Sequence, residues 1–322
     1  MLSSNGMSAE NSGQIDDRRM GSMTKTRIGV FLIWAYAASY GLALILALTG
    51  GAQSEWMMPL ALLMMITPAL VAVGMRRRSG EGYGDIAWRR FPPGYLLLAL
   101  VIPPVVTFIG TAGYAMIVAD GPGWVPWLTA DAAGMIYPPE DARMGEGPMT
   151  LGDLRATIAV KLTLNMLILM VFTFGEEFGW RGYLQPRMER RFGTRRAILL
   201  LALVWGFWHS GWHAQGVMMP EGVDPIAMTL LINPLYFLGL GTFYGWLYLR
   251  TGSIWVPVVA HASQNKVSGM VATFVDMGPV SELSLMASMS IGWLLVGLCL
   301  IPFLTPGRST ALLDFPEKEQ GP

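Results

Sequence analysis

Long runs of apolar residues, separated by short polar or charged segments, dominate this sequence. Each run approaches the roughly 20 residues that an α-helix needs to cross a bilayer. The runs cover about residues 28–50, 55–75, 94–119, 157–178, 197–215, 228–249, 253–273 and 284–304. The pattern predicts an all-α, polytopic transmembrane helix bundle of about eight spans.

The two ends of the chain lack this pattern. We expect residues 1–27 and 306–322 to be cytoplasmic tails, the first of them disordered, on either side of one bundle that covers residues 28–305. The composition agrees with a membrane protein, because 53% of the residues are hydrophobic, only 14% are charged and the mean hydropathy is +0.45. Soluble domains rarely have this balance.

Basic residues gather on one side of the predicted topology. They precede the first span, follow the second, and are densest after the fourth, in the segment 181–196. Short cytoplasmic loops collect Lys and Arg, so we predict that both termini are cytoplasmic. The formal net charge is zero and topology accounts for the basic loops, so nucleic-acid binding is excluded. Arg outnumbers Lys 18 to 4, which indicates a bacterial genome rich in GC.

The segment EEFGWR places two carboxylates at the end of the apolar run 157–178. A carboxylate inside a membrane helix costs roughly 2.5–3.5 kcal/mol, so such a pair indicates a functional site. Glu177 and Arg181 are four residues apart and share a helical face, which predicts an ion pair. Glu176 is rotated by about 100° and is free to accept a proton from water. The alternative is a structural charge network at the membrane edge.

The segment WGFWHSGWH places His209 and His213 four residues apart on one helical stripe. One interpretation makes His209 a partner of Glu176, with His213 nearer the far interface. The other is a zinc site of the HExxH kind, but the glutamate that this motif requires after its first histidine is Ser210 here.

The segment HASQN places His261 and Asn265 on one face of a later predicted helix. Both side chains can donate hydrogen bonds to a developing oxyanion in a cavity of low dielectric constant. The alternative is a core histidine satisfied by the neighbouring asparagine. Helical rise puts Glu176, His209 and His261 at similar depths, roughly 13–18 Å from the predicted cytoplasmic ends of their helices. We therefore expect them to form one polar layer.

At these residues the sequence resembles the CPBP family of membrane proteins, which comprises CAAX proteases and bacteriocin-processing proteins and includes the type II CAAX prenyl endopeptidases. The similar region covers about residues 157–273. Its three motifs are EExxxR at Glu176, Glu177 and Arg181, FxxxH at Trp205 and His209, and HxxxN at His261 and Asn265. The one departure is Trp205, where the family pattern has Phe.

The resemblance implies an all-helical intramembrane endopeptidase that acts on membrane-associated or lipidated peptides and proteins within the lipid bilayer. Glu176 and His209 would activate water, the HxxxN pair would hold the oxyanion, and Glu177 and Arg181 would support the site. We predict that no metal is required.

Other functions stay open at this point. A zinc-dependent metalloprotease would use Glu176, His209, His213 and His261 as ligands. A non-catalytic binding or immunity protein could keep the fold without turnover, and buried carboxylates and histidines also serve proton-coupled transporters.

Overall fold

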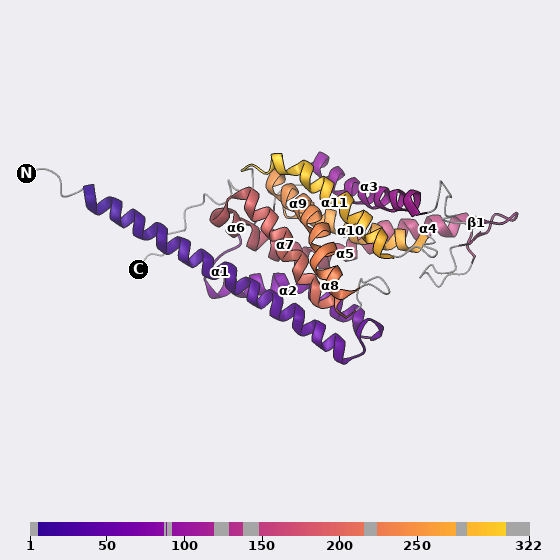
Figure 1. Ribbon diagram of the computed structural model, residues 1–322, viewed down its shortest axis with the longest axis horizontal. Coiled ribbons are helices and arrows are strands. Elements are labelled where there is room, and N and C mark those ends of the chain that lie inside the picture. The colour runs from indigo at the N-terminus through magenta and orange to yellow at the C-terminus, as the bar shows by residue number, and fades with distance from the viewer. Residues whose placement is uncertain are drawn as a thin grey trace, which may run out of the picture.

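A computed structural model gives the architecture of the chain, and it describes residues 6–86, 88, 92–118, 129–137, 148–215, 224–274 and 282–306. Helices lie side by side and form one elongated bundle (Figure 1). The helices are α1 (Gly6–Leu48), α2 (Met57–Arg78), α3 (Pro93–Val118), α4 (Leu151–Leu162), α5 (Leu164–Glu177), α6 (Gln185–Phe192), α7 (Thr194–His213), α8 (Pro225–Ala227), α9 (Asn233–Thr251), α10 (Trp255–Phe274) and α11 (Glu282–Leu300). Two-residue strands, β1 (Thr129–Ala130) and β2 (Ile136–Tyr137), pair as an antiparallel hairpin.

Four short helices of other kinds complete the described elements. The 3₁₀-helices are η1 (Gly51–Gln53) and η4 (Ile301–Phe303), and the π-helices are η2 (Phe178–Leu184) and η3 (Met228–Ile232). Each π-helix continues directly into an α-helix, α6 after η2 and α9 after η3.

The predicted all-α polytopic bundle is confirmed. Six helical stretches in the described part are long and apolar enough to cross a membrane: Thr26–Leu48, Met57–Arg78, Pro93–Gly110, Leu151–Phe192, Met228–Thr251 and Met286–Phe303. The other two predicted spans are α7 and α10, which have 20 residues each. That length spans about 30 Å, and these two helices carry the three histidines. The exact number of spans stays a prediction.

The structure describes part of the predicted N-terminal tail and almost none of the C-terminal one. Helix α1 begins at Gly6, so its first turns lie within the segment 1–27, and the disorder expected there stays a prediction. Residues 307–322 of the C-terminal tail lie outside the described residues.

Polar groups on α1 attach it to α7. Tyr36 Oη donates to the carbonyl oxygen of Val204 at 2.6 Å, and Tyr40 Oη donates to that of Phe207 at 3.1 Å. In the opposite direction, the indole N–H of Trp208 donates to the carbonyl oxygen of Ala35 at 3.0 Å. Hydrogen bonds between membrane helices hold them in one register. Helix α1 therefore fixes the rotation of the helix that bears His209.

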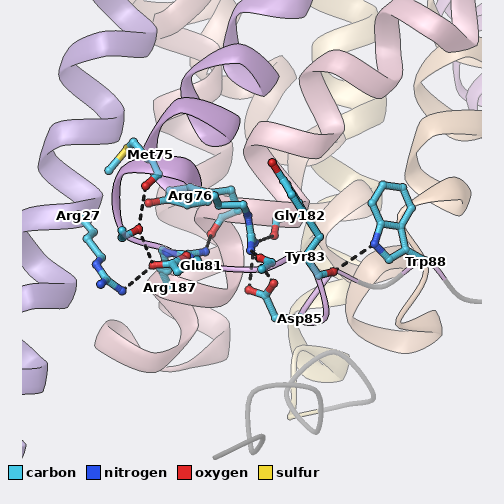
Figure 2. A network of polar contacts seen from close by, with 12 residues as sticks. Arg27, Met75, Arg76, Glu81, Tyr83, Asp85, Trp88, Gly182 and Arg187 are labelled. Carbon is cyan, nitrogen blue, oxygen red and sulfur yellow. Dashed lines mark hydrogen bonds and ion pairs between the residues drawn. The ribbon is translucent and has the colours of Figure 1, made fainter. Parts of the chain in front are cut away.

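A second polar network lies around residues 79–86 and Trp88, which follow α2 (Figure 2). Glu81 pairs with Arg27 at 2.7 Å and also with Arg187. Asp85 pairs with Arg76 at 2.6 Å. The three arginines come from three segments predicted to share one side of the membrane, and here they lie together.

Glycines allow close packing of α9 against α11. A Cβ atom at Gly239 would overlap the carbonyl oxygen of Trp293 and come within 2.6 Å of the nitrogen of Leu294. Membrane helices associate closely where small residues let their backbones approach, because lipid supplies no hydrophobic force between them.

We expect Gly239→Ala to destabilise the bundle by about 1–3 kcal/mol, because the added methyl group meets backbone atoms that cannot move aside. The midpoint of thermal unfolding of the purified protein in detergent measures this. Gly41→Ala in α1 is the matched control, since a Cβ there has no other atom within 4 Å. Equal midpoints for the two variants would show that the α9–α11 contact is looser than described.

Candidate active site

The two glutamates lie in the last turn of α5, directly before the π-helix η2. π-Helical turns are rare and are concentrated at functional sites. The segment is held tightly against α2: a Cβ atom at Gly179 would come within 2.6 Å of the carbonyl carbon of Pro68, and one at Gly175 within 2.8 Å of the carbonyl oxygen of Met65. The glycines on either side of the glutamate pair therefore let this segment contact the backbone of α2.

Glu177 is the centre of a buried ionic cluster. Its Oε1 atom accepts from Arg181 Nη1 at 3.0 Å and lies 2.9 Å from His261 Nδ1. Glu177 and Arg181 are completely inaccessible to solvent, and His261 is buried. The ion pair is the one that the four-residue spacing predicted. The contact with His261 was not predicted, because 84 residues separate it from Glu177 and no local spacing indicates such a pair.

Two aromatic rings contact the guanidinium of Arg181. Its central carbon lies 4.6 Å from the ring centre of Trp205 and 5.3 Å from that of Tyr244. A cation over an aromatic face is attracted by the ring quadrupole, and the attraction is larger away from water. The arginine is thus stabilised by one carboxylate and two rings.

Glu176 is buried and points to α7. Its Oε2 atom accepts a hydrogen bond from the indole Nε1 of Trp205 at 2.9 Å. Glu176 and Glu177 therefore face different partners, as the rotation of about 100° between neighbouring residues predicted. The sequence pattern identified Trp205 only as the aromatic residue of a motif and did not indicate this hydrogen bond.

His209 lies one turn further along α7. Its Nδ1 atom is 2.9 Å from the carbonyl oxygen of Trp205. A carbonyl oxygen can only accept, so Nδ1 carries the proton and, in the neutral ring, Nε2 has the free lone pair. The ring stacks on Phe237 with 4.5 Å between centres and meets Trp208 edge to face at 4.9 Å. Trp205 thus contacts both Glu176 and His209, the two residues that we expected to act together.

Helix α10 places His261 and Asn265 one turn apart. The ring of His261 packs edge to face against Trp205, with 5.3 Å between centres. The side chain of Asn265 is exposed. The neighbouring Gln264 is buried, and its amide nitrogen lies 3.0 Å from the hydroxyl of Tyr236. The role of Asn265 as an oxyanion donor stays a prediction.

The described geometry also bears on the alternative zinc site, whereas metal dependence itself stays a prediction. Within the residues that the structure describes, no group of three or more His, Cys, Asp or Glu side chains is placed to hold a metal ion. His213 lies one turn beyond His209, with 6.3 Å between the ring centres.

Comparison with known families agrees with the site. Residues 159–267, about a third of the chain, match the family described as type II CAAX prenyl endopeptidase Rce1-like. The matched segment contains all three motifs, so the resemblance inferred from them is confirmed there. The segment thus resembles a family of CAAX-type proteases, and the long apolar helices are those of a multi-pass membrane protein. No curated protein is similar enough to the chain to count as a match.

We expect Arg181→Ala to reduce protein abundance and thermal stability, because it leaves the buried carboxylate of Glu177 without its cation. Breaking a buried ion pair on one side costs about 3–5 kcal/mol. Yield and the unfolding midpoint in detergent measure the effect, and Arg195→Ala, at an exposed arginine, is the control. If Arg181→Ala were fully stable but inactive, Arg181 would belong to the chemistry of the site instead.

Proposed function

We propose that the protein, whose residues 159–267 have the sequence of a CAAX-type protease, is an intramembrane endopeptidase that hydrolyses peptide bonds in membrane-associated or lipidated, CAAX-like substrates. The observation that carries the proposal is the buried polar layer itself. Helices α5, α7 and α10, together with the π-helix η2, bring two carboxylates, an arginine and two imidazoles together in an apolar bundle. A structural role alone would not require so many charged and titratable groups at one depth.

The reaction begins with a water molecule. Glu176 takes one proton from it while His209 accepts a hydrogen bond from the same water, and the resulting hydroxide attacks the carbonyl carbon of the scissile peptide bond. The C–N bond of the tetrahedral intermediate then breaks, and the proton passes to the leaving amine. The geometry supports these roles, because in the described part of the chain Glu176 is hydrogen-bonded through Oε2, and the Nε2 of His209 has a lone pair.

His261 and Asn265 stabilise the oxyanion in this proposal. The Nδ1 of His261 is already committed to Glu177, which is a carboxylate because it pairs with Arg181. Donation from Nε2 to the oxyanion therefore requires both ring nitrogens to be protonated. The Glu177–Arg181 pair supports the site in this proposal by holding the Nδ1 of His261 in place.

The family and the bundle support the proposed substrate class. Type II CAAX prenyl endopeptidases, by their name, act on prenylated CAAX proteins, and a lipid-modified chain can reach the polar layer laterally from the bilayer. The ionic network of Figure 2 gathers the predicted cytoplasmic segments at one end of the bundle, and we propose that the site opens towards that side.

We expect Glu176→Gln to abolish cleavage while the protein stays folded, because the amide has nearly the same shape but cannot take a proton. The loss should be at least the 10²–10⁴-fold typical of a general base. New peptide termini in the membrane proteome of cells that express either form at equal abundance provide the measurement. Glu189→Gln is the matched control: Glu189 is another buried carboxylate, and its Oε1 accepts from Gln185 at 2.7 Å, away from the three motifs. Identical termini with wild type and Glu176→Gln would indicate a binding or immunity protein.

Exhaustive chelation should leave the activity of the purified protein unchanged, because glutamate and histidine supply the proton transfers in this mechanism. The rate of peptide cleavage before and after dialysis against a chelator tests this, with a known zinc protease treated in parallel. Loss of activity that added zinc restores would instead support the metalloprotease mechanism.

A further inference from the structure

Trp205 contacts more of the proposed catalytic machinery than packing alone would require. Its indole N–H donates to Glu176 Oε2 at 2.9 Å, and its backbone carbonyl accepts from His209 Nδ1 at 2.9 Å. The same ring lies over the guanidinium of Arg181 and against the edge of His261. The side chain is fully buried, so the hydrogen bond to Glu176 forms away from water.

The donor atom, rather than the aromatic ring, is the feature specific to tryptophan. Phe occupies this place in the motif pattern, and a phenyl ring can fill space and stack but cannot donate a hydrogen bond. A hydrogen bond to a carboxylate is charge-assisted and about twice as strong as one between neutral groups. In an apolar bundle it also fixes the rotamer of the glutamate, since few other polar atoms compete for its oxygens.

We propose that Trp205 is a positioning residue for the reaction: its indole N–H holds Glu176 Oε2, so that Oε1 is the oxygen that takes the proton from water. This inference rests on the proposed endopeptidase function. The backbone carbonyl of Trp205 accepts from Nδ1 of His209 and so leaves the lone pair of that ring on Nε2. One residue therefore orients both Glu176 and His209, the two groups proposed to activate water. A general base must lie within hydrogen-bonding distance of the proton that it removes, so fixing one oxygen favours productive geometry at the other.

The same helix offers a matched control. Trp208 is also fully buried and also packs against His209, but its indole N–H donates to the backbone of α1, at the carbonyl oxygen of Ala35. Removing the N–H of either tryptophan costs one buried hydrogen bond of the same donor type. Only the change at position 205 removes a bond to Glu176.

The kinetic test compares Trp205→Phe with Trp208→Phe on one membrane-embedded peptide substrate that the wild type cleaves. We expect Trp205→Phe to lower kcat by about tenfold or more, with KM within about twofold of the wild type, because a displaced base slows the chemical step without changing substrate binding. Trp208→Phe should keep kcat within about twofold of the wild type per folded molecule, because the hydrogen bonds of Tyr36 and Tyr40 still hold α1 on α7. The folded fraction is measured by gel filtration and thermal unfolding for each variant.

A second substitution separates the hydrogen bond from the ring packing. Replacing Trp205 with 3-benzothienylalanine keeps the two fused rings over Arg181 and exchanges the N–H for sulfur. We expect the same fall in kcat as for Trp205→Phe. Wild-type kcat in this variant would overturn the inference, because the ring alone would then suffice.

A spectroscopic measurement tests the bond without using activity. In protein labelled with ¹⁵N-tryptophan, the indole N–H signal that disappears in Trp205→Phe is assigned to Trp205. If that variant fails to accumulate, the benzothienylalanine protein gives the assignment. Glu176→Ala should shift this signal and leave that of Trp208 in place, and an unmoved Trp205 signal would overturn the inference.

The outcomes separate this inference from the proposed function. If the wild type cleaves, Glu176→Gln does not, and Trp205→Phe has the same kcat as Trp208→Phe, the endopeptidase stands and the role of Trp205 is wrong. If Glu176→Gln cleaves as well as the wild type, the endopeptidase stands, but Glu176 is not its base and the positioning role of Trp205 is wrong. If the wild type itself does not cleave, the proposed function fails and the positioning role fails with it.

Discussion

Charge that is buried in an apolar bundle has to be compensated locally, and the arrangement around Glu177 depends on this constraint. One carboxylate oxygen serves both Arg181 and His261, and aromatic rings cover the guanidinium. An unpaired charge at this depth would cost several kcal/mol, so the cluster forms as a unit or not at all. Because the cluster joins α5 and η2 to α10, the electrostatic requirement also fixes where those helices meet.

Packing around the cluster also holds the helices of the polar layer in place. Glycines let the glutamate segment lie directly on α2, and the hydroxyls of α1 bond the backbone of α7. At one end of the bundle, Arg76 pairs with Asp85 and also reaches the carbonyl oxygen of Gly182 in the π-helix at 3.4 Å. The polar layer is thus held by helices that contribute no catalytic side chain to it, α1 and α2 among them.

Local spacing predicted the parts of this structure that depend on nearest neighbours. Apolar runs of about 20 residues gave the helices, and four-residue spacing gave the Glu177–Arg181 pair. Equal depth along three helices gave the shared polar layer. Spacing within one helix does not indicate which residue of another helix a given side chain will contact. The contacts of His261 with Glu177 and of Trp205 with Glu176 were therefore missed, as was the π-helix, which differs from an α-helix only in its hydrogen-bond register. The roles of the individual site residues stay predictions that mutants can test.

The pairing of α1 with α7 also sets an order of events during synthesis. Tyr36 and its acceptor Val204 are 168 residues apart, and Trp208 and Ala35 are 173 apart. At about 5–20 residues per second, the ribosome needs roughly ten to thirty seconds to make the intervening chain. During that interval α1 has no α7 to bond to, and the hydroxyls of Tyr36 and Tyr40 lie at the far end of their rings, where they cannot reach the carbonyl groups of their own helix. They must bond water, lipid headgroups or another part of the protein instead. Helix α1 therefore reaches its final contacts with α7 long after its own synthesis, and the helix that bears His209 is fixed only once both have been inserted.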